Sequence, residues 1–169
     1  MRLNATIAEG KVRYSEVRDN FGFVCWTYEL NDGGFYDSII ETTHDRKKRS
    51  NEARTYKFYK GKKTLISIEI NTRNGSIEES YNVKGNIVYR ILRNREGLIH
   101  NTGEPAYQEW YDNGLRKSEF YYTRNKLNNP TGPAVSKWKE TGYLLRHKYY
   151  SHGNRIHRDI LADRIERSF

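Results

Sequence analysis

Apolar and polar residues alternate with a period of two along most of the chain, which is the pattern of β-strands. The alternation is clearest over residues 64–71, where three isoleucines occupy one face of the expected strand. Turn residues separate the alternating runs at short intervals, as at Asn74-Gly75 and Lys84-Gly85. The pattern therefore predicts a mainly β protein, built as an elongated antiparallel meander of β-hairpins.

A repeat of 28 residues is visible when residues 97–122 are laid over residues 125–150. A Pro-Ala step, a tryptophan, a glycine and a Tyr-Tyr pair recur at this separation. They are Pro105-Ala106 and Pro133-Ala134, Trp110 and Trp138, Gly114 and Gly142, and Tyr121-Tyr122 and Tyr149-Tyr150. A fixed period of this length is typical of stacked supersecondary units. We therefore expect hairpin repeats over residues 64–154, with the period clearest in 97–150.

Each repeat contains a turn and a proline step that indicate where its strands begin. Asn113-Gly114 lies between two aromatic-rich runs, which predicts a type I′ turn with positive φ at both central residues. Proline cannot donate to a sheet ladder, so Pro105 and Pro133 are expected where the first strand of each unit begins. Strand alternation should place the two members of each Tyr-Tyr pair on opposite faces of the sheet.

The two ends of the chain depart from the repeat. Residues 1–63 keep strand-like runs with turn residues between them, and we expect them to form a non-repeating, β-rich N-terminal cap. Residues 155–169 change to a helical period with four apolar residues on one face. This pattern predicts a short C-terminal α-helix that covers the last sheet edge. The three parts are expected to form one continuous domain.

Composition favours a thin sheet over a deep core. The chain has 169 residues, of which 36% are hydrophobic and 14% aromatic, and 14 are tyrosines. Tyrosine combines a large apolar ring with a hydroxyl group that tolerates water, so it suits a sheet whose faces are partly wet. The start of the chain is polar and no apolar run is long enough to cross a membrane. We therefore expect a soluble, cytoplasmic protein without a membrane partner.

The recurring residues resemble those of MORN-type repeats, in the variant with a Leu-His…Gly-Pro-Ala…Trp…Asn-Gly…Tyr-Tyr pattern that is common in bacteriophage and giant-virus proteins. The resemblance covers about half of the chain. Glu104 stands where the pattern has glycine, and Asn128 stands where it has histidine. The resemblance implies a meandering sheet that serves as an interaction surface and has no catalytic residues. It also implies an accessory phage or bacterial factor that binds and neutralises a host protein, in defence or counter-defence.

The charge of the chain adds a second class of partner. The net charge is +9, the isoelectric point is about 9.6, and the surplus is spread over both halves of the sequence. Residues 56–63 interleave aromatic rings with cations, as base-stacking surfaces do. Residues 46–49 form a compact basic cluster within a polar stretch, 41–54, that is typical of a charged loop. Capture of nucleic acid or of a small signalling nucleotide on a basic aromatic face is therefore the alternative function.

The residues that could catalyse a reaction or bind a metal have simpler structural interpretations. His147, His152 and His157 are five positions apart, which places neighbours on opposite faces of a strand and leaves them without acidic or cysteine partners at ligand spacing. His100, which recurs with the repeat, is expected to cap a turn or to pack on a ring. Cys25 is the single cysteine and is flanked by apolar residues, as a buried structural cysteine is. We predict no enzyme activity, no metal and no cofactor.

The predicted interaction surface combines the repeated aromatic residues with neighbouring cations. Aromatic and arginine side chains dominate the energetics of protein interfaces. The set consists of Trp110, Tyr121, Tyr122, Trp138, Tyr149, Tyr150, Arg116, Arg124, Arg146 and Lys148. One face of the sheet is expected to pack these rings and the other to display them. We therefore expect a non-enzymatic binding protein whose partner is a host protein.

Overall fold

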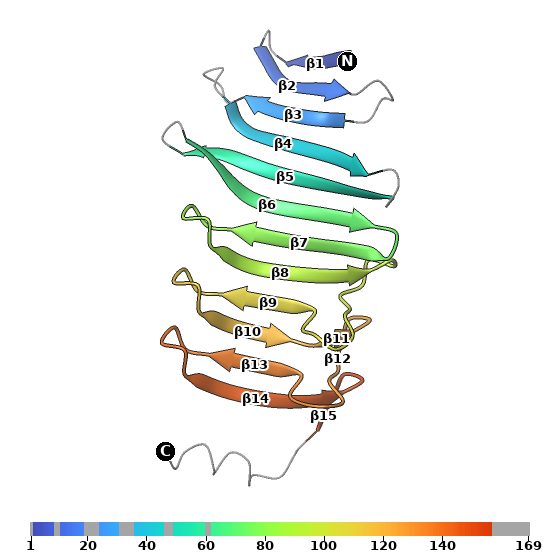
Figure 1. Ribbon diagram of the computed structural model, residues 1–169, viewed down its shortest axis with the longest axis vertical. Helices are drawn as coiled ribbons and strands as arrows, with labels where there is room; N and C mark the ends of the chain where they lie inside the picture. Colours follow the sequence, from blue (N-terminus) through green and yellow to red (C-terminus); the bar gives the residue numbers. More distant parts are fainter. Residues whose placement is uncertain are drawn as a thin grey trace.

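The computed structural model of the protein describes the backbone of residues 2–8, 11–18, 24–30, 36–45, 49–59 and 62–156, and the side chains of residues 27, 38–43, 49–58 and 62–156. The described residues form a mainly β structure and contain no helix. Thirteen of their strands form one antiparallel sheet, and two short strands pair with each other beside it (Figure 1).

Strand order in the main sheet follows the chain. The strands are β1 (Arg2–Ala8), β2 (Lys11–Arg18), β3 (Val24–Leu30), β4 (Tyr36–Asp45), β5 (Ser50–Tyr59), β6 (Lys62–Thr72), β7 (Gly75–Tyr81), β8 (Ile87–Asn94), β9 (Tyr107–Trp110), β10 (Arg116–Phe120), β13 (Val135–Trp138), β14 (Leu144–Ser151) and β15 (Asn154–Ile156). The separate pair is β11 (Tyr122–Thr123) and β12 (Lys126–Leu127). The antiparallel meander is therefore confirmed. Strands β1–β5 continue the same sheet, whereas the division into cap and repeats stays a prediction.

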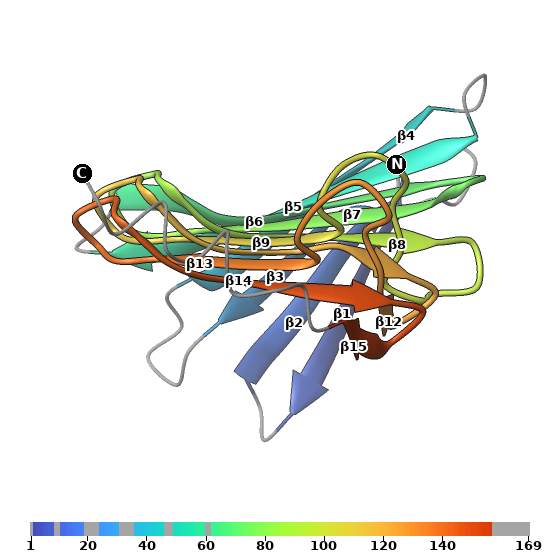
Figure 2. The ribbon, with the colours of Figure 1, turned by 90° about the horizontal axis from the view of Figure 1, so that it is seen from below.

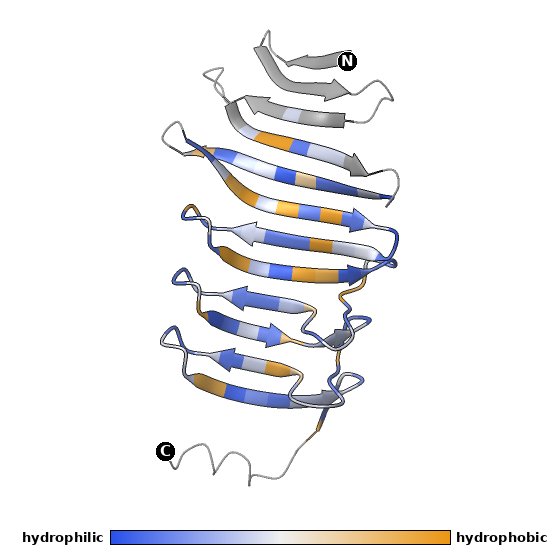
Figure 3. Ribbon diagram, viewed as in Figure 1, coloured by the Kyte–Doolittle hydropathy of each residue, from blue (hydrophilic) through white to orange (hydrophobic). Residues whose placement is uncertain are grey.

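The main sheet is a single twisted layer. Figure 2 shows the sheet in profile. Strands β1–β3 are rotated away from the others, because strand twist accumulates along the sheet. Apolar and polar residues alternate most clearly along β6 (Figure 3). Among the described side chains, the buried hydrophobic residues are Ile39, Ala106, Ala134 and Val135. A deep core is therefore absent from this part of the chain.

The 28-residue repeat is visible in the backbone hydrogen bonds. Bonds of the first unit have counterparts 28 residues further along the chain. The pairs are Ala106 N–H to Phe120 O and Ala134 N–H to Lys148 O, Asn101 N–H to Tyr122 O and Asn129 N–H to Tyr150 O, and Asn125 N–H to Ile99 O and Gly153 N–H to Leu127 O. The repeating hairpin structure is therefore confirmed.

The Pro-Ala steps mark the starts of equivalent strands. Pro105 lies two residues before β9, and Pro133 lies two residues before β13. The two alanines that follow the prolines are 0% exposed, and each donates its backbone N–H to the neighbouring strand. Because no space remains around these methyl groups, a small residue is required at both positions.

Six hairpins share a β-bulge near the same end of the sheet. In each, the register shifts so that one extra residue on the second strand lies opposite the first strand. The extra residues are Arg13 in β2, Asp37 in β4, Ile66 in β6, Val88 in β8, Lys117 in β10 and Leu145 in β14. A bulge bends its strand and increases the local twist, so this column of bulges accounts for the curved profile in Figure 2.

The predicted type at the Asn113-Gly114 turn is wrong, although the hairpin is present. Gly114 has a φ of 83°, but Asn113 is not among the residues with positive φ. Tyr111 N–H bonds to Leu115 O, which closes a three-residue loop. The side chain of Asn113 explains the difference, because it accepts a hydrogen bond from Leu115 N–H at 2.9 Å and donates one to Glu140 O at 3.0 Å.

The predicted charged loop over residues 41–54 is also wrong. Strands β4 and β5 pair through most of this stretch, and only residues 46–49 separate them. The pairing is favoured by β-branched threonines in β4 and by contacts across the face. Lys63 forms an ion pair with Glu41, and its Nζ lies 4.0 Å from the ring centre of Tyr56. Within residues 56–63, Lys63 and Tyr56 thus contact each other inside the sheet.

The predicted C-terminal helix is not supported at its start. Arg155 and Ile156 belong to β15, where they pair with Tyr150 and Tyr149. The physical reason is a turn at His152-Gly153, where both residues have positive φ, 50° and 89°, and the chain reverses onto β14. Residues 157–169, including His157, lie outside the described residues.

The turn between β6 and β7 gives a test of this backbone. Gly75 has a φ of 146°, and a Cβ added there would lie 1.9 Å from the backbone O of Arg93. We expect Gly75→Ala to lower the free energy of unfolding by about 2 kcal/mol or more, because both the φ angle and the contact are unfavourable. Urea denaturation monitored by tryptophan fluorescence measures this change.

The matched control is Gly85→Ala. Gly85 has a φ of 87°, but open space surrounds the added Cβ, so only the backbone cost of about 1 kcal/mol applies. Equal losses in the two variants would contradict the close approach of β8 to Gly75.

Candidate functional site

The register of the strands sorts the described side chains onto two faces. Gln108, Glu119 and Ser136 lie opposite one another in β9, β10 and β13 and therefore share a face. We call it the tryptophan face, because it also carries Trp110 and Trp138. The other face, which we call the tyrosine face, carries Tyr89, Tyr107, Glu109, Ser118, Phe120 and Tyr122.

The ten predicted site residues do not form one surface. Strand alternation places Trp110, Trp138, Arg116, Tyr149 and the repeat-equivalent Tyr121 on the tryptophan face. The same rule places Tyr122, Tyr150, Arg146 and Lys148 on the tyrosine face. Arg124 is exposed in the turn between β11 and β12. Each Tyr-Tyr pair is therefore divided between the faces, and the assignment of these residues to a binding role stays a prediction.

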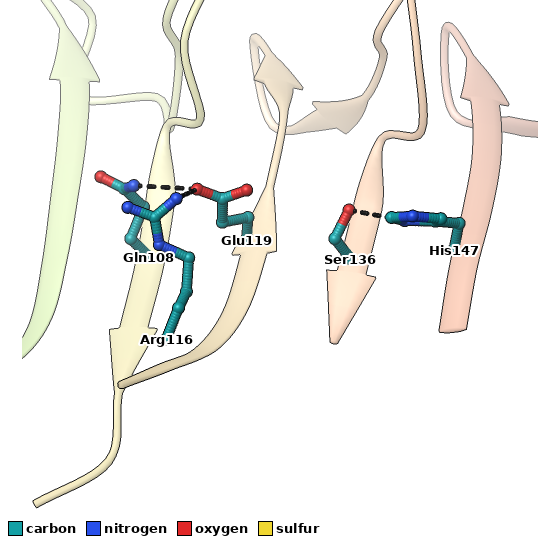
Figure 4. A network of polar contacts seen from close by, with 5 residues as sticks. All are labelled: Gln108, Arg116, Glu119, Ser136 and His147. Atoms are coloured by element: carbon teal, nitrogen blue, oxygen red, sulfur yellow. Dashed lines mark hydrogen bonds and ion pairs between the residues drawn. The ribbon is translucent and has the colours of Figure 1, made fainter. Parts of the chain in front are cut away.

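A row of polar contacts crosses the tryptophan face (Figure 4). Glu119 is 8% exposed, accepts a hydrogen bond of 3.2 Å from Gln108 and forms an ion pair with Arg116. Ser136 Oγ and His147 Nδ1 are 2.9 Å apart in the next strand pair. The contacts from Gln108 and Arg116 satisfy the buried carboxylate of Glu119, which would be costly to bury without partners.

Trp110 and Trp138 occupy equivalent positions at the bulge end of this row. The guanidinium carbon of Arg116 lies 6.0 Å from the ring centre of Trp110. In the second unit Leu144 pairs with Trp138 in place of arginine. Both tryptophans are half-buried. They therefore pack against the sheet and still present part of their rings to solvent.

Exposed apolar side chains lie beside the two tryptophans. Tyr143 is 74% exposed, Leu145 is 54% exposed and Leu115 is 44% exposed. Leu115 Cδ1 lies 3.8 Å from the place that a Cβ on Gly142 would take, so the turn before β10 contacts the turn before β14. We call Leu115, Tyr143 and Leu145 the apolar end. The sequence pattern missed it, although Leu115 and Tyr143 recur with the 28-residue period.

The tyrosine face has its own network, centred on Glu109. Tyr107 and Ser118 donate hydrogen bonds to its two carboxylate oxygens at 2.8 and 2.7 Å. The ring of Tyr107 meets that of Phe120 edge-on, with 5.5 Å between the ring centres. Lys137 Nζ lies 5.5 Å from the ring centre of Phe120. This face is therefore an internally bonded mixture of rings, carboxylates and lysines.

The network keeps its acid ionised and its phenols neutral. Burial raises the pKa of Glu109, but hydrogen bonds from Ser118 and Tyr107 and nearby lysines outweigh it, so the pKa lies below the usual value. A hydrogen bond to Glu78, together with burial, raises the pKa of Tyr89 to about 12. On the tryptophan face, burial and a hydrogen bond to Glu79 likewise raise the pKa of Tyr81 to about 12. Glu109 is thus held as a hydrogen-bond acceptor instead of being poised near neutral pH for proton transfer.

The described histidines make structural contacts. Arg124 N–H lies 3.4 Å from His100 Nδ1, and in the next unit His152 N–H donates to Asn128 Oδ1 at 3.1 Å. Asn128, which replaces histidine in the repeat, therefore has the same role as His100. Within the described residues, no group of three or more His, Cys, Asp or Glu side chains is arranged to hold a metal ion.

No protein-family model, no curated protein and no solved structure matches the chain. The resemblance to MORN-type repeats therefore stays a prediction. Over the residues that the structure describes, no helix has the length and apolarity needed to cross a membrane.

The raised tyrosine pKa values predict an alkaline loss of stability. A group whose pKa is raised on folding contributes stability below its unfolded pKa, about 10 for tyrosine, and loses it as pH rises through the folded value. For Tyr81 and Tyr89 this window runs from about pH 10 to about 12. We expect the free energy of unfolding in urea to fall across it, and to fall less in Tyr89→Phe. A wild-type value that is constant from pH 10 to 12 would contradict these environments.

Proposed function

We propose that the protein is a non-catalytic, repeat-built binding protein that engages another protein through the tryptophan face and the adjoining apolar end. The observation that carries this proposal is that two equivalent tryptophans share one face, beside three exposed apolar side chains. Large aromatic and aliphatic groups that are exposed together mark interaction surfaces in soluble domains.

The composition of this surface suits a protein interface. Trp110, Trp138 and Arg116 are of the residue types that most often carry binding energy, and their positions are fixed by strand pairing and by the Glu119 ion pair. A surface held in place before binding loses little conformational entropy when the partner arrives. The neighbouring Tyr143 and Leu145 would lose exposed apolar area on binding, which favours association.

The resemblance to phage repeat proteins supports a sharper version of the proposal. In that version the chain is an accessory phage or bacterial factor that neutralises a host protein by covering part of its surface. Occlusion requires only a stable interface and no reaction, which agrees with a sheet whose described carboxylates mostly serve as hydrogen-bond or ion-pair acceptors.

The proposal is tested by affinity capture with the tagged full chain from a bacterial host lysate, with and without nuclease. We expect one stoichiometric, nuclease-resistant protein, identified by mass spectrometry. Its recovery should fall at least about tenfold with Tyr143→Ser combined with Leu145→Ser, because exposed positions at an interface centre carry binding energy with little effect on folding. Trp110→Ala should have the same effect, with circular dichroism used to check that the sheet is intact.

The matched control is Ile156→Ser. Ile156 is 41% exposed but lies in β15, away from the apolar end. Equal capture by wild type and by the Tyr143 and Leu145 double variant would overturn the proposed surface, as would recovery of nucleic acid alone.

A further inference from the structure

The turns at the end of the sheet opposite the apolar end carry arginines in succession. Arg49 precedes β5, Arg73 lies between β6 and β7, and Arg95 follows β8. All three side chains are exposed. Figure 1 shows these turns along one edge, on the right. Because they recur after every second strand and strands are spaced about 4.8 Å apart, the arginines follow one another at intervals on the order of 10 Å.

Two open hollows lie between these turns. The first, of about 580 Å³, is lined by Arg49, Asn51, Asn71, Thr72, Arg73 and Arg95. The second, of about 680 Å³, is lined by Arg73, Asn74, Asn94, Arg95, Glu96 and His100. Arg73 and Arg95 line both hollows, so the two are adjacent, and we call them together the arginine trough.

The described lining of the trough has three arginines and one glutamate, so its charge is positive. Three arginines on the sheet faces have carboxylate partners: Arg54 pairs with Glu52, Arg90 with Glu79, and Arg116 with Glu119. In the described part of the chain, no carboxylate pairs with Arg49, Arg73 or Arg95. Neighbouring like charges repel one another, and an anion that bridges them relieves this repulsion.

Arg49 occupies a backbone position that favours other residue types. Its φ is 50°, in the left-handed region where glycine and asparagine are preferred. The backbone conformation of this turn therefore does not call for an arginine, whereas the side chain of Arg49 adds a positive charge to the trough. The substitution Arg49→Asn can therefore test the role of the charge, because asparagine removes the charge and is favoured at this φ.

The lining of the trough distinguishes between possible anions. Its side chains are arginine, asparagine, threonine, histidine and one glutamate, and none of them is apolar. A protein interface would need an apolar centre. Guanidinium, amide and hydroxyl groups are the groups that contact nucleic-acid phosphates, and a row of cations fits a linear polyanion better than a single phosphate.

We propose that the arginine trough binds the phosphate backbone of a nucleic acid, independently of base sequence and separately from the protein-binding surface. The lining contains no Phe, Tyr or Trp side chain, so we expect contacts with phosphates, which do not depend on base sequence, to outweigh base stacking here.

Fluorescence anisotropy of a labelled single-stranded oligonucleotide of mixed sequence, titrated with the full chain at several salt concentrations, tests this site. We expect binding at low salt and a linear fall of log K with log salt, about 0.7 for each phosphate contact. The combined substitutions Arg49→Asn, Arg73→Gln and Arg95→Gln should weaken binding at least about tenfold and reduce the slope by about 2.

The matched control removes the same charge from the other end of the strands. Lys62, Lys84 and Lys139 are exposed at or beside the turns there, and their combined change to glutamine should alter affinity less than about threefold and leave the slope unchanged. The single variant Arg49→Asn serves as a further check, because it weakens binding without straining the fold.

Three results would overturn the proposal. The first is the absence of oligonucleotide binding at low salt. The second is an equal loss of affinity in the arginine and lysine variants, which would indicate a general attraction to the net charge. The third is binding to vesicles with anionic lipids but not to the oligonucleotide. The protein capture described above uses nuclease-treated lysate and residues at the opposite end, so each proposal can fail alone.

Discussion

A single-layer sheet has no second layer against which side chains can be buried, so its stability depends on contacts along its own two faces and on the backbone ladder. Buried apolar residues are accordingly few among the described side chains, while Ser118, Glu119 and Ser136 are buried and polar. The polar row on the tryptophan face and the hydrogen bond between Ser118 and Glu109 on the tyrosine face provide contacts that cross from strand to strand. Cross-strand pairs of this kind are the unit of sheet stabilisation, and the many tyrosines suit them because a ring can pack while its hydroxyl group bonds.

Because the sheet has a single layer, the turns at its two ends expose different kinds of side chain. Side chains in the middle of the sheet are engaged by their neighbours on both sides, whereas turn residues have fewer neighbours. At one end the turns contact one another, through Asn86 Nδ2 to Asp112 O and Asn113 Nδ2 to Glu140 O, and they expose leucine and tyrosine. At the other end the turns are separated by open hollows and expose arginine. The surfaces free to bind therefore lie mainly at strand ends, with the half-buried tryptophans joining one of them to a face.

Much of the architecture was predictable because period-two alternation and turn residues are local signals. The meander, the repeat and the starts of β9 and β13 follow from them. The turn type at Asn113 was not predictable, since it depends on a contact with Glu140, 27 residues away. The pairing of β4 with β5 was not predicted, because the polar residues of this stretch are typical of a loop. Contacts with neighbouring strands stabilise the strand conformation there. The small hairpin of β11 and β12 needs positive φ at Arg124 and Asn125, and arginine gives no sequence signal for it. The trough joins turns from distant parts of the sequence, so composition alone could not reveal it.

The recurrence of the bulge and of the turn contacts has a consequence for how this molecule can change in size. A unit that repeats its hydrogen bonds every 28 residues meets its neighbour in the same way wherever it stands in the array. Duplication of one such segment would add two strands, about 10 Å of length, to the main sheet. The existing contacts would stay as they are. The length of the sheet available to a partner therefore changes in steps of one repeat. A single duplication or deletion in the gene would lengthen or shorten it by one such step.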